Sequence, residues 1–165
     1  MRFTKFAFLA TLLLLAATAR NTTADQTIYA DALTNAWEDW SWATVSLTAT
    51  SPVYSGTHAI RVTPGAWEAL RLNHAAMDTT GYSNLMFRIH GGATGGQLLL
   101  VQALRGTTPQ TAVNLPPLTN TWQLLTLNLS ALAVSNVSDF TGFWIQDRSG
   151  AAQGARSGRE SLQPC

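Results

Sequence analysis

The sequence has one cysteine and one lysine among its 165 residues, and charged side chains make up only 12% of it. A single cysteine cannot form an internal disulfide, and three widely spaced histidines give no zinc-binding pattern. A formal net charge of +1 offers no basic field for phosphate groups. These absences exclude a disulfide scaffold, a zinc finger and a nucleic-acid partner. A near-neutral chain with six tryptophans is left.

The first residues are typical of an export signal. Arg2 and Lys5 precede an apolar run over residues 6–17, and a small-residue site follows at Ala17-Thr-Ala19. This pattern predicts a signal peptide over 1–19, a short linker over 20–26, and a secreted protein that is free of the membrane after cleavage. The alternatives are a buried N-terminal helix or an uncleaved anchor. Cleavage removes two of the ten basic residues and leaves eight against nine acidic ones.

The remainder shows the alternation of β-strands. Apolar residues recur at every second position between turn residues, which indicates an all-β sandwich or barrel over residues 27–150. The segment Gly91–Gly96 joins two apolar strands, as a hairpin loop would. Residues 151–165 lack alternation and aromatic residues, so they are predicted to form a disordered or frame-shifted tail.

Strand parity predicts which side chains point away from the core. If leucine, phenylalanine and isoleucine point inward on each strand, a mixed set of tryptophan and planar polar groups points outward. A pyranose has an apolar face that stacks on tryptophan, and its hydroxyls bond to amide, guanidinium and imidazole groups. The alternative is that these side chains pack under a loop or cover a sheet edge. The outward set comprises Trp67, Arg71, Asn73, Met86, Arg88, His90, Gln102, Trp144 and Gln146.

A second feature is the tryptophan-rich segment over residues 36–43. Trp40 and Trp42 share strand parity and Trp37 does not, so one or two of the three are expected in the core. The remaining ring, beside Glu38 and Asp39, is expected to line a loop site, and Trp37 is taken as the candidate.

Catalysis lacks a sequence signature. A glycosidase needs two carboxyl groups across the scissile bond, and a serine hydrolase of the common kind needs a GxSxG turn. No GxSxG occurs, and nothing in the spacing of the acidic residues pairs them, so the chain is predicted not to be an enzyme. The acidic candidates are Asp31, Glu38, Asp39, Glu68 and Asp147.

Several segments together resemble the jelly-roll carbohydrate-binding modules of secreted microbial proteins, within the galactose-binding-like β-sandwich superfold. The resemblance covers about residues 27–150 and rests on Tyr29-Ala-Asp-Ala-Leu33, AWEDWSWA (36–43), SPVYSGTHAIRVT (51–63), AWEALRLNH (66–74), DTTGYSNLMFRIHGG (78–92), TNTWQLLTLNLSAL (119–132) and GFWIQDRSG (142–150). It implies an antiparallel two-sheet jelly-roll sandwich without catalytic function, often found with plant-polysaccharide hydrolases.

The resemblance also implies a closing strand that this sequence lacks. Many such modules end in a strand of the pattern aromatic-x-x-Asp-Asp-Ile/Val-x-Leu, whose Asp often helps to hold a structural calcium. Here GARSGRESLQPC (154–165) stands in its place. We therefore expect the final strand to be lost by truncation or frameshift. No cofactor is predicted, because Asp31 without a partner Asp supplies too few oxygen ligands for calcium.

The sequence therefore predicts non-catalytic binding of a polysaccharide or oligosaccharide, with a glycoside hydrolase as possible partner in a related full-length protein. The rivals are a structural or adhesion domain of a cell-surface protein, in which Trp67 and Trp144 would be buried, and a small glycosidase or lyase. A damaged gene product that folds poorly is a further alternative. The candidate site residues are Trp37, Trp67, Arg71, Arg88, His90, Gln102, Trp144, Gln146 and Asp147.

Overall fold

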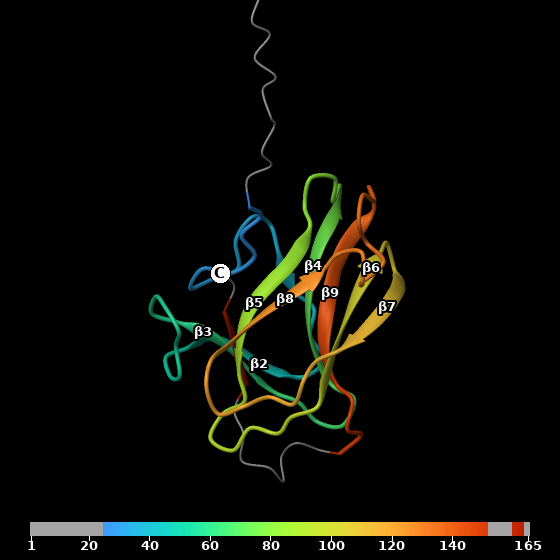
Figure 1. Cartoon of the computed structure of the whole chain (residues 1–165). Helices are drawn as coiled ribbons and strands as arrows, with labels where there is room; N and C mark the ends of the chain where they lie inside the picture. The colour runs from blue at the N-terminus through green and yellow to red at the C-terminus, as the bar shows by residue number, and fades with distance from the viewer. Residues whose placement is uncertain (1–24, 152–159, 164–165) are drawn as a thin grey trace, which may run out of the picture.

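The computed structural model describes residues 25–151 and 160–163, which form two five-stranded sheets packed face to face (Figure 1). Every pairing is antiparallel, and the described residues contain no helix. This confirms the predicted all-β, antiparallel two-sheet jelly-roll sandwich. The predicted signal peptide, most of the linker, and tail residues 152–159 and 164–165 lie outside the described residues.

The first sheet, named here the β9 sheet, has the order β1-β4-β9-β6-β7, and the second, the β5 sheet, has the order β2-β3-β10-β5-β8. The strands are β1 (Glu38–Asp39), β2 (Thr44–Ala49), β3 (Ala59–Thr63), β4 (Ala69–Met77), β5 (Asn84–His90), β6 (Leu99–Arg105), β7 (Thr108–Asn114), β8 (Gln123–Asn128), β9 (Phe140–Asp147) and β10 (Glu160–Gln163).

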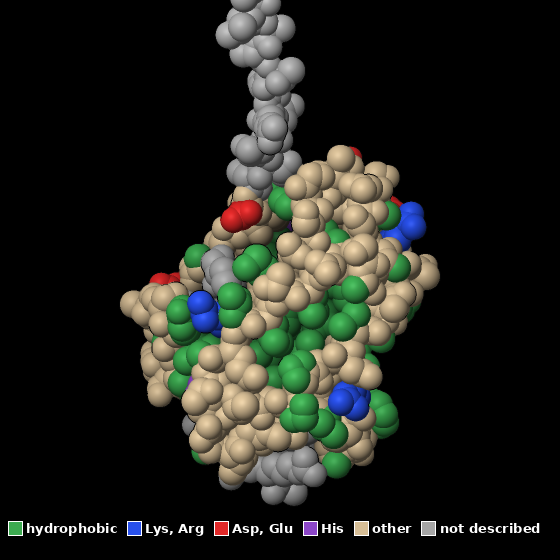
Figure 2. All heavy atoms as spheres, viewed as in Figure 1, with side chains coloured by type: hydrophobic (Ala, Val, Ile, Leu, Met, Phe, Trp, Pro, Cys, Tyr) green, Lys and Arg blue, Asp and Glu red, His purple; other side chains and the backbone are tan. Residues whose placement is uncertain are grey.

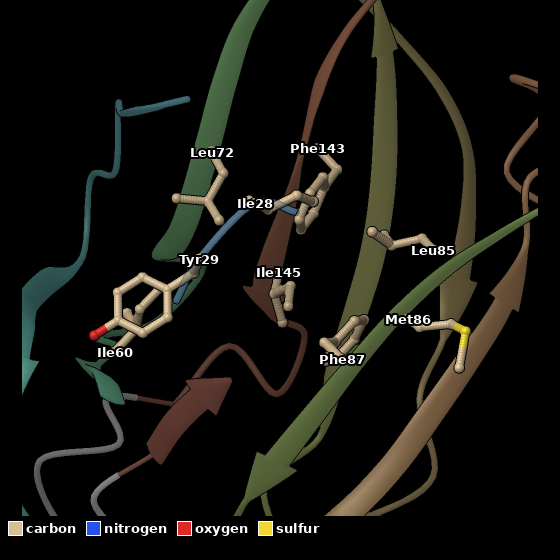
Figure 3. A pocket seen from close by; sticks show the side chains of 9 residues that line it. All are labelled: Ile28, Tyr29, Ile60, Leu72, Leu85, Met86, Phe87, Phe143 and Ile145. Carbon is tan, nitrogen blue, oxygen red and sulfur yellow. The ribbon is translucent and has the colours of Figure 1, made fainter. Parts of the chain in front are cut away.

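The core lies between the sheets and follows the predicted parity. Phe87 and Ile89 of β5 are buried in the same cluster as Phe143 and Ile145 of β9. In Figure 3, apolar side chains from β3, β4, β5 and β9 line one small cavity. Burial of each such side chain stabilises the fold by about 1.5–3 kcal/mol. The alternate positions on the same strands are therefore left for the two outer faces.

The segment Gly91–Gly96 does not close a hairpin. It joins β5 to β6, which lie in different sheets, so it is a crossover between the two layers. Gly91 and Gly96 donate their N–H groups to the carbonyls of Thr119 and Leu118 at 2.8 and 2.6 Å. The glycine content indicates a turn, and the structure has one here, but local sequence does not reveal which sheet the next strand joins.

A strand does lie in the position where none was expected. Residues Glu160–Gln163 form β10, which pairs with β3 on one side and with β5 on the other. Ser161, for example, pairs with both Arg61 and His90. Ladder hydrogen bonds join backbone groups, so a segment without hydrophobic alternation can still occupy the gap between two strands with free edges.

Candidate functional site

Four tryptophans gather on the outer face of the β9 sheet. Trp40, Trp42 and Trp67 are 52%, 43% and 56% exposed, and Trp144 of β9 is half-buried. The rings of Trp42 and Trp144 meet edge to face with centroids 5.6 Å apart. We call these four residues the Trp platform. Large aromatic groups this exposed are unusual unless they contact a ligand or partner.

The chain after β1 places two members of the platform. The N–H groups of Trp40 and Trp42 donate to the carbonyls of Arg71 and Ala69 at 2.9 and 3.2 Å, which extends the pairing of β1 with β4. The Arg71 guanidinium carbon lies 5.1 Å from the centroid of the Trp40 ring. Since Arg71 points outward from β4, the segment carries its rings across the outer face of the sheet.

Trp67 sits in a turn that its surroundings hold in an unfavourable conformation. Its φ is 62°, in the left-handed region that bulky residues avoid. Its carbonyl accepts hydrogen bonds from Trp42 Nε1 at 2.9 Å and from Gln146 Nε2 at 2.8 Å. Strain of this kind persists only where neighbouring groups fix the backbone, and it often marks a functional site.

Asp147 is one of the groups that fix this turn. It is fully buried, and its Oδ2 accepts the N–H groups of Trp67 at 3.4 Å and Gly150 at 3.1 Å. Its Oδ1 accepts the hydroxyl of Ser149 at 2.7 Å. Asp147 therefore orders the loop around Trp67 from beneath and does not itself face a ligand.

A polar row crosses the sheet beside the tryptophans. Register places Arg71 next to Trp144 and Trp144 next to Gln102. Gln102 Nε2 donates to the carbonyl of Gln110 at 2.6 Å, and Arg71 donates to Asn73 Oδ1 at 3.3 Å. These bonds hold the planar groups in place beside the aromatic rings.

Two donors in this row lack a partner. Arg71 Nε and Trp144 Nε1 are buried and make no hydrogen bond to any described residue. An unpaired buried donor costs about 1–3 kcal/mol. The row therefore keeps hydrogen-bonding capacity that the described part of the chain does not use.

Trp37 belongs to the core and not to the site. It is 5% exposed, and its ring lies 5.9 Å from Phe143 and 6.2 Å from Phe140, centroid to centroid. The structure thus assigns the three rings of the segment in the opposite way to the sequence analysis, since Trp40 and Trp42 are the exposed ones. Their shared parity, opposite to that of Trp37, was the signal that could have identified them.

Arg88 and His90 lie on β5, in the other sheet. They point outward, as parity predicted, but onto the opposite surface of the molecule. Five of the nine candidates, Trp67, Arg71, Gln102, Trp144 and Gln146, are therefore brought together, and two others form a separate surface.

The other carboxylates are engaged in local loop contacts. Asp31 Oδ1 accepts the N–H groups of Thr57 and His58, both at 2.8 Å, and these bonds hold the pKa of Asp31 below its usual value. Glu68 Oε2 accepts the N–H of Gly65 at 2.7 Å, and Asp39 Oδ1 accepts that of Ser41 at 3.0 Å. Over residues 25–151 and 160–163, no three His, Cys, Asp or Glu side chains form a metal-binding group.

Within residues 25–151 and 160–163, no helix has the length and apolar character needed to cross a membrane.

Comparison with known structures identifies the fold. The family 30 module of a cellulosomal cellulase from Clostridium thermocellum superposes with a TM-score of 0.58 at 14% identity, over 76% of this chain and 88% of that one. The family 11 module from Clostridium thermocellum, in complex with a β-1,3-1,4-mixed-linked tetrasaccharide, gives a TM-score of 0.53 at 11% identity, over 84% and 92%. The chain has the β-sandwich fold of carbohydrate-binding modules.

Comparison of sequences relates part of the chain to an endoglucanase. An endoglucanase of Dictyostelium discoideum is 34% identical over 134 residues, which is 76% of this chain. The match spans only 19% of the length of the endoglucanase. No protein-family model matches the chain.

Proposed function

We propose that this domain is a secreted, non-catalytic module that binds a polysaccharide on the Trp platform. The observation that carries the proposal is the exposure of Trp40, Trp42 and Trp67 on one sheet face of a carbohydrate-binding-module fold. Indole rings supply apolar area for the C–H faces of sugars, and they lose little conformational entropy on binding. The structural or adhesion rival required Trp67 to be buried, whereas it is 56% exposed.

The polar row supplies the directional contacts. Sugar hydroxyls both donate and accept, so Arg71, Gln102 and Gln146 beside the rings fix where a chain lies. The platform is open, so it buries little ligand area, and we expect modest affinity.

The ligand we propose is a β-glucan chain. The related Dictyostelium protein is an endoglucanase, and the family 11 module was solved in complex with a β-1,3-1,4-mixed-linked tetrasaccharide. The 75° angle between the rings of Trp42 and Trp144 prevents both from lying flat on one planar surface. This favours a single glucan strand over a crystalline face.

The acidic residues do not favour catalysis. Asp31, Asp39, Glu68 and Asp147 each accept local N–H or hydroxyl groups, and Glu38 accepts the Trp40 Nε1–H at 2.8 Å. None of these roles is that of a carboxyl pair across a glycosidic bond. A glycoside hydrolase is instead proposed as partner, in the way that the related endoglucanase carries a matching segment within a longer chain.

Affinity electrophoresis in gels containing mixed-linked β-glucan tests the proposal. W67A and W42A should abolish retardation, and W144A should do the same, while circular dichroism stays that of the wild type. Y54A, which removes an exposed aromatic residue from a loop on the other side of the molecule, is the matched control and should migrate as the wild type does. Wild-type retardation of W67A would overturn the proposed site, and product release from the gel polymer would overturn the non-catalytic assignment.

A further inference from the structure

A second aromatic cluster lies on the outer face of the β5 sheet. The Arg88 guanidinium carbon is 3.9 Å from the centroid of the Tyr54 ring, and the rings of Tyr54 and Trp122 are 5.9 Å apart. Trp122 in turn lies 5.3 Å from the His90 ring. We call these four residues the Tyr54 cluster. Tyr54 is 47% exposed, so the cluster reaches the solvent and is not part of the core.

The surface continues along the neighbouring strands. Leu124 of β8 is paired with Arg88 of β5 and is 45% exposed, and Met86, two residues from Arg88 on the same strand, is 41% exposed. Figure 2 shows that apolar side chains reach the surface of the molecule in several places, some of them next to basic ones. The combined area offers apolar contact next to a cation.

Charge distinguishes this surface from the Trp platform. On the Trp platform the cation of Arg71 is accompanied by the acidic residues Glu38 and Asp39 of the neighbouring strand β1. The β5 sheet carries Arg61 on β3 and Arg88 on β5, the two strands that flank β10. Neither arginine forms an ion pair with a described residue. The ion pair that residues 25–151 and 160–163 do contain joins Arg105, of the other sheet, to Asp139. The nearby loop carboxylate, Asp31, already accepts the N–H groups of Thr57 and His58.

Arg88 and His90 keep donor groups that no described residue accepts. Arg61 donates through Nη2 to the carbonyl of Ser51, and the guanidinium of Arg88 makes no hydrogen bond to a described residue. His90 Nδ1 accepts the N–H of Gly92 at 3.0 Å, so its Nε2 carries the hydrogen. Burial lowers the pKa of His90, so this imidazole is neutral at neutral pH and donates without charge.

These groups match the chemistry of a sugar that carries a carboxylate. A guanidinium that lies this close to an aromatic ring still has N–H groups along its edge, and that fork fits a carboxylate with two parallel hydrogen bonds. The rings of Tyr54 and Trp122 supply the apolar contact that the sugar ring requires. We propose that the Tyr54 cluster is a second binding site, which takes a uronate-containing glycan through Arg88.

Polygalacturonate and its methyl ester provide the direct test, because the two polymers share a backbone and differ in charge. The wild-type chain should be retarded in gels containing polygalacturonate and not in gels containing fully methyl-esterified polymer. Added salt should weaken the retardation, since an exposed charge pair is screened. Equal retardation by both polymers, or by neither, would overturn the proposal.

Variants then locate the site. R88Q should weaken binding to polygalacturonate about tenfold or more, as expected when a charge-assisted hydrogen bond is lost. R105Q removes the same charge from the far end of β6 and should change the affinity by less than about twofold. Y54A keeps every charge and should also weaken binding, which covers the case in which R88Q does not fold. An equal effect of R88Q and R105Q would show nonspecific attraction and would reject the site.

The experiment is independent of the β-glucan proposal. W67A should bind polygalacturonate as the wild type does, and R88Q should bind β-glucan as the wild type does. If one proposal fails, the other is therefore still confirmed or rejected by its own experiment.

Discussion

Asp147 connects the interior of the sandwich to the orientation of a surface tryptophan. The carboxylate is fully buried, and it accepts the N–H groups of Trp67 and Gly150 and the hydroxyl of Ser149. Gly150 has a φ of 66°, and an added Cβ there would lie 3.0 Å from the Trp67 ring. The loop and the ring are therefore packed as one unit.

D147A should destabilise the fold and weaken β-glucan binding together. Its removal leaves three donors in a buried site without their acceptor, which we expect to lower the free energy of unfolding by about 3 kcal/mol. Urea denaturation and affinity electrophoresis measure the two effects. D139A, which removes an exposed partner of Arg105, is the control and should change neither quantity appreciably. Loss of stability with normal glucan binding would contradict the proposed role.

Trp37 illustrates how far the sequence alone could go at the level of single residues. Parity separates Trp37 from Trp40 and Trp42, but it does not tell which of the two groups faces the core until one residue of the segment is placed. In the structure, Trp37 faces the core because it packs against Phe140 and Phe143, which lie about a hundred residues away in the sequence. A local pattern does not contain that information.

At the scale of strands, alternation predicted the all-β class and the division between inward and outward residues. It does not extend to β7, because this edge strand is mostly exposed and contains Pro109, so it shows no apolar period. It also placed Arg71 and Arg88 in one outward set, although the two residues lie in different sheets. Parity separates inside from outside, but only long-range pairing decides which of the two outer faces a residue occupies.

The strand β10 makes a testable contribution to the β5 sheet. It pairs with β3 and β5 on its two edges, so deletion of residues 152–165 should leave both edges unpaired. We expect the deletion to lower the free energy of unfolding by at least about 2 kcal/mol and to promote aggregation. Removal of residues 164–165 alone is the control and should keep the wild-type denaturation midpoint. An unchanged midpoint after the longer deletion would show that β10 adds nothing to the sheet.

For the molecule as a whole, acid should reduce stability in two stages. Burial lowers the pKa of His90 below its usual 6.5, so the unfolded chain binds this proton first as the pH falls. This proton therefore leaves the free energy of unfolding unchanged above a pH of about 6.5 and lowers it progressively below that pH. Hydrogen bonds lower the pKa values of Asp31 and Asp78, and their contributions are lost only as the pH falls below the usual aspartate value of 3.8.

Melting temperatures measured by circular dichroism from pH 8 to pH 3 check this dependence. H90Q cannot take up the proton, so it should remove the upper stage and leave the lower one. D31N should reduce the lower stage and leave the upper one. A wild-type melting temperature that is constant between pH 7 and pH 5 would contradict the assignment to His90.

The two aromatic surfaces lie on opposite sheets of one sandwich, and this arrangement predicts that they act independently. The β9 sheet and the β5 sheet pack face to face (Figure 1). The Trp platform is on the outer face of the first and the Tyr54 cluster on that of the second, so the core lies between them. Mutations in sites without shared contacts have additive effects on free energy. We therefore expect the double variant W67A/R88Q to lose each ligand as the corresponding single variant does, with no coupling.

Titration calorimetry with soluble glucan and galacturonate oligosaccharides measures that coupling directly. Saturation with one ligand should leave the dissociation constant of the other unchanged within about twofold, and both should bind with one ligand per chain. The chain should then link one polymer of each kind, which is measured as coprecipitation of labelled polygalacturonate with insoluble β-glucan. Competition between the two oligosaccharides would place them on a single surface, and the exposed rings of the other sheet would then have to be explained by contacts within the protein.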